Sequence, residues 1–159
     1  MDGIALAESI PDSVLPYPDG SWNRVKYFFW RLLTPWFPAI QGGFLRLGVI
    51  QHPGGRGRYL LGHLAPGIDA SLFVRRLEAE GVGNHFIAWT EEDQVLSLRK
   101  LDGFEHQYHL RIFGDGEVRG HYEYTPEAHP VWHQKAIGIE RRREDLLRLL
   151  GDLVVKSDE

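Results

Sequence analysis

The chain has 159 residues, a formal net charge of −4 at pH 7 and no cysteine. Its length fits a single domain, and the absence of cysteine excludes a disulfide framework, thiolate zinc sites and cysteine nucleophiles. The net negative charge argues against bulk non-specific DNA binding, although the charges are unevenly spread: residues 20–68 contain six Arg or Lys and no acid, whereas residues 69–159 sum to −6.

Residues 1–20 are rich in proline and end in the turn sequence Pro18-Asp19-Gly20, so we expect an irregular N-terminal arm followed by one domain over 21–159. The arm has no basic region ahead of an apolar run, as a secretory signal would have. We therefore expect a cytoplasmic protein, a location that also suits a chain without cysteine.

A helix is predicted over residues 22–33, because apolar residues recur there at helical spacing and Pro35 then withholds an amide. Its apolar face, predicted to pack on a sheet as core, consists of Trp22, Val25, Phe29, Leu32 and Leu33. Tyr27, Phe28 and Trp30 widen the apolar arc beyond what one sheet contact needs, which is typical of a helix that is deeply buried, oligomeric or bound to a partner. Basic residues and two prolines make the segment a poor transmembrane helix.

The rest of the chain predicts strands of alternating apolar and polar residues, together with two further helices. In chain order, we expect a hairpin of strands 44–51 and 58–64, a helix over 69–80, strands over 84–90, 94–101, 104–113 and 117–124, and a helix over 139–155. Short turns join the last four strands, so they should form an antiparallel meander. The predicted fold is α+β: an antiparallel sheet of about six strands (β-hairpin, helix, four-stranded meander) with an N-terminal aromatic helix, a C-terminal amphipathic helix and the helices on one face.

The segment 104–124 allows its strand register to be derived. A three-residue loop over 114–116, which ends in glycine, keeps apolar residues on one face of the hairpin and polar residues on the other, whereas a two-residue turn would mix the faces. This register places His109 directly across from His121 and, one pair further along, Gln107 across from Glu123.

Two imidazoles beside a carboxylate could hold a metal ion or phosphate, or serve acid–base chemistry. The competing interpretation is an ordinary solvent-exposed face of an antiparallel sheet. A metal site needs a third well-placed ligand, so the sequence alone assigns no metal and no cofactor. His129 and His133, four residues apart, give no specific signal either, because Pro130 argues against a helix that starts before it and the pair lacks the glutamate of a zinc-protease motif.

Our main hypothesis from the sequence is a small non-enzymatic module that binds an anionic partner through the basic and aromatic residues of 20–68. The partner would be nucleic acid or an acidic protein surface. The residues expected to bind the anion are Arg24, Tyr27, Trp30, Arg31, Arg56 and Arg58.

Two other functions stay open at this point. The first is a histidine-dependent or metal-dependent phosphodiester hydrolase or nuclease, with His109 and His121 as acid–base groups or metal ligands and Glu123 as the carboxylate that orients them. The second is a structural or assembly protein that docks through the aromatic helix 22–33. A homo-oligomer and a peripheral contact with an anionic membrane are further associations that this helix allows.

Overall fold

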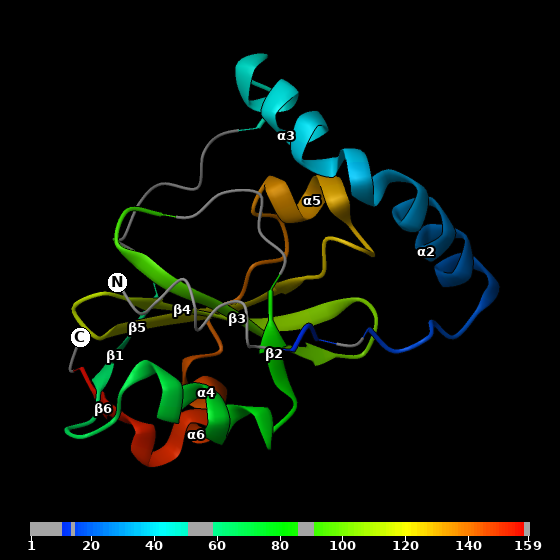
Figure 1. The fold of residues 1–159 in the computed structure, drawn as a ribbon. Coiled ribbons are helices and arrows are strands. Elements are labelled where there is room, and N and C mark those ends of the chain that lie inside the picture. The colour runs from blue at the N-terminus through cyan, green and yellow to red at the C-terminus, as the bar shows by residue number, and fades with distance from the viewer. Residues whose placement is uncertain (1–10, 14, 51–58, 86–90, 158–159) are drawn as a thin grey trace.

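The computed structural model describes residues 11–13, 15–50, 59–85 and 91–157. Its centre is a six-stranded sheet with the strand order β2-β3-β4-β5-β1-β6, in which every pair of neighbours is antiparallel. Helices precede, interrupt and follow the strands (Figure 1). The α+β fold with an antiparallel sheet, an N-terminal helix and a C-terminal helix is thus confirmed.

The strands of the meander follow one another in space as they do in the chain. They are β2 (Val82–Asn84), β3 (Gln94–Asp102), β4 (His106–Phe113) and β5 (Glu117–Tyr124). β1 (Leu60–Leu64) pairs with β5 on one side and with β6 (Val154–Lys156) on the other. The sheet therefore gains its sixth strand from the C-terminal end of the chain.

The predicted hairpin of 44–51 with 58–64 is wrong in its first strand. Residues Phe37–Arg46 form helix α3, and residues 51–58, including the predicted glycine-rich tip, lie outside the described residues. Phe37 and Gln41, four residues apart, are the buried positions of α3. Helical spacing therefore decides the structure here, and the two glycines at 42 and 43 do not interrupt it.

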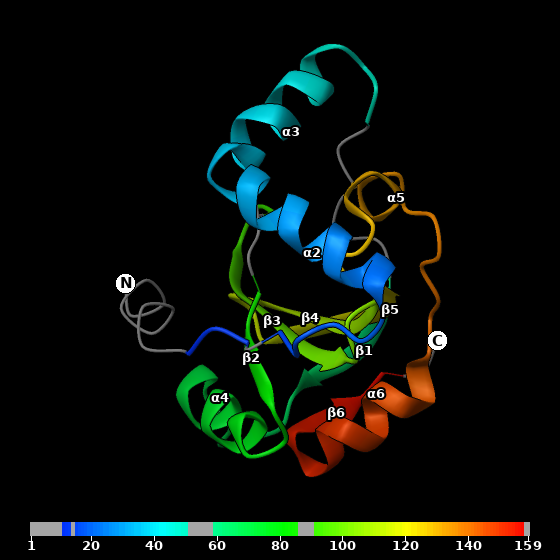
Figure 2. The ribbon, with the colours of Figure 1, turned by 90° about the vertical axis from the view of Figure 1, so that its right-hand side faces the viewer.

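One face of the sheet is apolar and is covered by α4 (Ala70–Glu78) and α6 (Arg143–Leu150), as Figures 1 and 2 show. Its core cluster includes Phe73, Leu98, Leu110 and Leu146, each at most 1% exposed. The predicted last helix is shorter than expected, because Gly151 adopts a positive φ and ends α6. A short 3₁₀ helix, η2 (Gly151–Leu153), then leads directly into β6.

The other helices lie on the opposite side of the sheet, so helices cover both faces and not one as predicted. They are α2 (Ser21–Leu33), the 3₁₀ turn η1 (Thr34–Trp36), α3 and α5 (Pro130–Gln134) (Figure 1). None of the helices in the described ranges is long and apolar enough to cross a membrane.

The face of α2 that was predicted to be core is exposed. Trp22, Phe29 and Leu32 are 69%, 56% and 56% exposed, whereas Trp30 is buried with its ring 4.8 Å from that of Phe37. The physical reason is that α4 and α6 already occupy the apolar face of the sheet. The helix α2 instead meets the rest of the protein through its other side, which leaves its apolar stripe in solvent.

The register of the β4–β5 hairpin is confirmed. His109 pairs with His121, Gln107 with Glu123, and the strands end and begin at Phe113 and Glu117, on either side of the three-residue loop. The last loop residue, Gly116, has a φ of 85°, which a glycine adopts without strain. Period-two alternation therefore fixes which side chains share a face.

Candidate metal centre on the polar face of the sheet

The face of the sheet opposite the hydrophobic core is polar and yet buried. The buried side chains that share it include Ser97, Arg99, Gln107, Arg111, Glu117, Arg119, His121 and Glu123. The expectation of an ordinary solvent-exposed face is therefore wrong. Polar groups at such depth must be satisfied by one another or by a ligand. We call this set of residues the polar layer.

The carboxylate of Glu123 lies at the centre of a group of nitrogen atoms. His109 Nδ1 is 3.3 Å from Oε1, and His121 Nε2 is 3.0 Å from Oε2. Gln107 Nε2 donates to Oε1 at 2.8 Å. These residues come from the paired strands β4 and β5, so their backbones are held by the sheet ladder.

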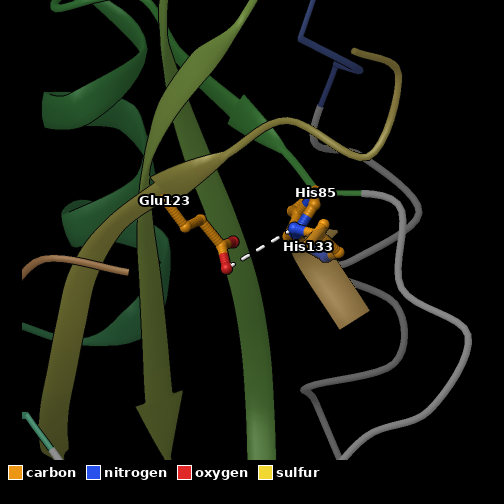
Figure 3. A group of neighbouring side chains, drawn as sticks. All are labelled: His85, Glu123 and His133. Atoms are coloured by element: carbon orange, nitrogen blue, oxygen red, sulfur yellow. Dashed lines mark ion pairs between the residues drawn. The ribbon is translucent and has the colours of Figure 1, made fainter. Parts of the chain in front are cut away.

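Two further histidines, which the sequence did not assign to this site, complete the group. His85, directly after β2, is buried, and its ring centroid lies 4.5 Å from that of His109. His133, on α5, places Nδ1 3.5 Å from Glu123 Oε2, as Figure 3 shows. Four imidazoles and one carboxylate therefore meet in one place, which we call the His–Glu cluster.

The sequence did not assign His133 and His85 to the site, for a different reason in each case. Pro130 is in the first turn of α5, where a missing amide costs nothing, so a short helix begins there and aims His133 at the sheet. The only feature of the sequence that pointed to His133 is its spacing of four residues from His129. In the structure the two histidines have different contacts: His129 stacks on Trp132, whereas His133 approaches Glu123. The position of His85 follows from β2, which begins at Val82, two residues before the predicted start of the strand 84–90; residues 86–90 lie outside the described residues.

The cluster contains two sets of three groups whose ligand atoms lie within 4.8 Å of one another: His109, His121 and Glu123, and His85, His133 and Glu123. Two ligand atoms that each lie about 2.1 Å from a metal ion are about 3.0–3.4 Å apart for angles between 90° and tetrahedral. The two N···O distances of the first set, 3.3 Å to Oε1 and 3.0 Å to Oε2 of Glu123, fall in this range. Glu123 is therefore the candidate for the third ligand that a metal site here would need.

The protonation states suit metal coordination. Burial lowers the pKa of His109 to about 4, and burial together with the neighbouring His109 and Arg99 lowers the pKa of His85 well below its usual value. Burial alone would raise the pKa of Glu123, but the charges of His133 and His121 and the hydrogen bonds of the cluster hold that pKa well below its usual value. Neutral imidazoles and an ionised carboxylate are the forms that bind a metal.

Two buried nitrogen atoms of the cluster are unused. Among the described residues, neither His85 Nδ1 nor His121 Nδ1 has a hydrogen-bond partner. His109 Nε2, by contrast, lies 2.9 Å from Ser97 Oγ. A metal-binding histidine typically bonds through its other nitrogen to a polar group, and Ser97 occupies that position for His109.

The three guanidiniums of the polar layer are each paired with a carboxylate. Arg99 pairs with Glu127 at 2.8 Å, Arg111 with Glu91, and Arg119 with Glu117. Among the described residues, Glu91, Glu117, Glu127 and Glu123 together give four carboxylates against three guanidiniums, an excess of one negative charge when the histidines are neutral. A divalent cation at the cluster would reverse the sign of this sum.

The residues predicted to bind an anion are not brought together by the described part of the chain. Trp30 is buried, and the ring of Tyr27 packs between those of Tyr17 and Phe104, so neither ring is free to stack on a base. Arg24 lies over the ring of Tyr17, with its Cζ atom 5.3 Å from the ring centroid.

The remaining arginines of that set divide into two groups. Arg31 is exposed on α2. Arg56 and Arg58 lie outside the described residues. Among the described residues of the set, Arg24 and Arg31 are therefore the ones at the surface, both on α2.

Comparisons of the chain with protein-family models, with curated proteins and with solved structures found no match. The assignment of a function therefore depends on the geometry of the His–Glu cluster.

Proposed function

We propose that this protein is a metal-dependent hydrolase that holds a divalent transition-metal ion with His109, His121 and Glu123 and acts on phosphodiesters. The observation that supports the proposal is the convergence of three ligand atoms from β4 and β5 at a buried site, with the carboxylate as the third ligand. The sequence alone favours a non-enzymatic binding module. The convergence of these three groups is our reason to favour the hydrolase instead. Two histidines and one glutamate form the ligand set of several hydrolytic zinc sites, and the same set suits Fe²⁺.

The set with His109 and His121 is a better candidate than the set with His85 and His133. Nδ1 of His133, the atom that approaches Glu123, donates its proton to the backbone oxygen of Tyr124 at 2.8 Å, so only Nε2 of His133 would be left to bind a metal. Nδ1 of His109 can be left without a proton and so be free to bind a metal. The proton then lies on Nε2, where the hydroxyl oxygen of Ser97 can accept it. Neutral imidazole exchanges tautomers at no cost in charge.

The residues around the proposed ligands suit hydrolysis. A bound divalent ion supplies a water of lowered pKa and polarises a phosphoryl oxygen. His133 is the most exposed histidine of the cluster, with 18% of its side chain accessible, so it is placed to exchange a proton between the site and solvent. His85 is neutral and buried. Its Nε2 lies 3.3 Å from Nε2 of Gln107 and so orients that side chain.

The charge of the polar layer supports an anionic substrate. Without a metal, the described residues of the layer together with Glu91 and Glu127 have one excess negative charge, which would repel a phosphodiester. A divalent ion changes the excess to one positive charge, so the metal would be needed both to bind the substrate and to activate water.

The proposal is tested by metal titration and by an activity assay on the same preparations. Zn²⁺ and Co²⁺ are added to chelator-treated protein and followed by calorimetry and by the visible absorption of Co²⁺. Cleavage of bis-p-nitrophenyl phosphate is then measured with and without the metal. We expect one equivalent of metal to bind and to restore cleavage, and we expect both properties to be lost in the His109→Gln/His121→Gln double variant.

His63→Gln is the matched control, because His63 is exposed on β1 and outside the cluster. It should bind metal and cleave substrate as the unmodified protein does. Metal binding that survives in the double variant would overturn the assignment of ligands. Metal binding without any metal-dependent cleavage would overturn the assignment as a phosphodiester hydrolase.

A further inference from the structure

The helix α2 and the turn η1 present a continuous apolar surface to solvent. Its members are 42–69% exposed: Trp22, Val25, Phe28, Phe29, Leu32, Leu33 and Trp36. They recur at the spacing of one side of a helix. We call this surface the aromatic face. A surface helix normally turns such a stripe toward the core, so its exposure over two helical elements marks an interaction site.

The opposite side of α2 explains why the aromatic face is free. Tyr27 packs on Phe104, Lys26 donates to Glu105 at 3.1 Å, and Trp30 is buried against Phe37. The helix is therefore anchored by one side and offers the other. This arrangement involves no residue of the His–Glu cluster, so the inference is independent of the proposed hydrolase.

The charged residues of α2 and α3 are all positive. Arg24 and Arg31 are exposed on α2, seven residues apart and so on one side of the helix, and Arg46 is exposed on α3. The whole segment 20–68 contains no acid. If a second copy of the chain packed on this face, the guanidiniums of both copies would come together without an acid from either helix to offset them.

We propose that the aromatic face binds the surface of an anionic lipid bilayer, with α2 lying in the plane of the interface. Phe29 and Leu32 would enter the boundary between headgroups and acyl chains, while Arg24 and Arg31 contact the lipid phosphates. A helix of 13 residues is too short to span a bilayer but long enough to lie on it. One side of a helix is convex, and a fluid apolar layer conforms to such a side more readily than a folded protein surface does.

The distribution of tryptophan supports this orientation. Trp22 and Trp36 are at the two ends of the aromatic face and are 69% and 67% exposed. Indole rings favour the level of the headgroups, where one edge is apolar and the N–H meets water. Two such rings at the ends of the face would hold the helix parallel to the bilayer.

The test uses the full chain and vesicles of phosphatidylcholine alone or with one quarter phosphatidylglycerol. We expect co-sedimentation with the anionic vesicles and at least tenfold weaker binding to the neutral ones. Phe29→Ser/Leu32→Ser should reduce binding to anionic vesicles at least tenfold, and Arg24→Gln/Arg31→Gln should remove the preference for anionic lipid. Val155→Ser is the matched control, because Val155 is also 56% exposed but lies on β6.

Several results would overturn the inference. Absence of binding to the anionic vesicles at low salt would do so, as would equal binding by the Phe29→Ser/Leu32→Ser variant. A concentration-dependent dimer that this variant abolishes would assign the face to a second copy. An oligonucleotide or an acidic peptide that binds through Arg24 and Arg31 while vesicles do not would assign it to the partner class expected from the sequence.

Discussion

His109 Nδ1 lies 3.3 Å from Oε1 of Glu123, although His109 pairs with His121, two residues before Glu123 on β5. The diagonal contact lets Glu123 receive an imidazole from each strand, because His121, two residues before it on β5, reaches its other oxygen. One carboxylate thus joins two strands and two histidines within the polar layer. Its removal should therefore affect folding as well as chemistry.

Glu123→Gln tests the structural part of this role in the metal-free protein. The substitution keeps the shape but replaces an accepting oxygen by an NH₂ group, which would face the donors of Gln107 and the histidines. Loss of a buried charged acceptor from such a network is expected to cost on the order of 3 kcal/mol of unfolding free energy. Urea denaturation measures this loss.

The control for this variant is Glu78→Gln, an exposed glutamate on α4. Its unfolding free energy should stay within about 0.5 kcal/mol of that of the unmodified protein. If Glu123→Gln behaved in the same way, the carboxylate would not be the centre of the network.

The stability of the metal-free protein should fall as the pH falls from about 6.5. His109 has a folded pKa of about 4, below its unfolded value, so between these pH values the unfolded state takes up a proton that the folded state refuses. Above pH 6.5 His109 is neutral in both states and contributes no slope. The lowered pKa of Glu123 extends the loss below its unfolded value of 4.5, in the same direction.

His109 alone accounts for a loss on the order of 3 kcal/mol across its window, since one pKa unit corresponds to about 1.4 kcal/mol. Urea denaturation at a series of pH values, in the presence of a chelator, measures the slope. The His109→Gln variant should show a flatter profile between pH 6.5 and 4, and His63→Gln should not. A profile that is equally steep in both variants would contradict the linkage.

Local patterns in the sequence predicted only the part of the site that lies within the hairpin 104–124. Alternation along 104–124 places His109, His121 and Glu123 on one face, because side chains of a strand alternate with a period of two. The contribution of His85 and His133 depends on how β2 and α5 pack against that hairpin, and packing between distant segments leaves no local signal. Burial of the face was missed for the same reason.

The error at α2 has a different origin. Its amphipathic pattern correctly predicts a helix, but the pattern cannot say whether the apolar stripe meets a sheet. The segments 70–78 and 143–150 compete for the same apolar sheet face and occupy it, since Phe73 and Leu146 are fully buried there. In the same way, the pattern predicts that the helix continues beyond Gly151, because Leu153 follows Leu146 and Leu150 at helical spacing.

Metal binding should stabilise the protein if the proposed ligands are correct. A ligand present at 100 times its dissociation constant adds about 2.7 kcal/mol to the free energy of unfolding when it binds only the folded state. For a domain of this size, such a gain raises the melting temperature by roughly 5–10 °C. Thermal unfolding with Zn²⁺, and then with excess chelator, measures a shift that should be reversible.

The variant set separates the specific site from weak binding at other histidines. The shift should disappear in His109→Gln/His121→Gln and persist in His63→Gln, whose side chain is exposed. A shift of equal size in all three proteins would place the metal elsewhere. Persistence in the double variant together with loss in His85→Gln would favour the second set of ligands.

Gly62 tests the pairing of β1 with β6, the part of the sheet that the sequence did not predict. It has a φ of 156°, and a Cβ atom added to it would overlap the carbonyl oxygen of Val155 and approach Val154 Cγ1 to 2.9 Å. Because the overlap is with backbone of the neighbouring strand, Gly62→Ala should push β6 away and cost more than about 2 kcal/mol. The matched control is Gly43→Ala in α3, where nothing lies within 4 Å of an added Cβ and alanine should be neutral or stabilising by up to about 1 kcal/mol. Hydrogen exchange at Ala65 and Ser157, whose amides donate to Leu153 and Leu61 between the two strands, locates the effect: faster exchange at both in Gly62→Ala alone is the expected result, and unchanged exchange would mean that β6 is not held by β1.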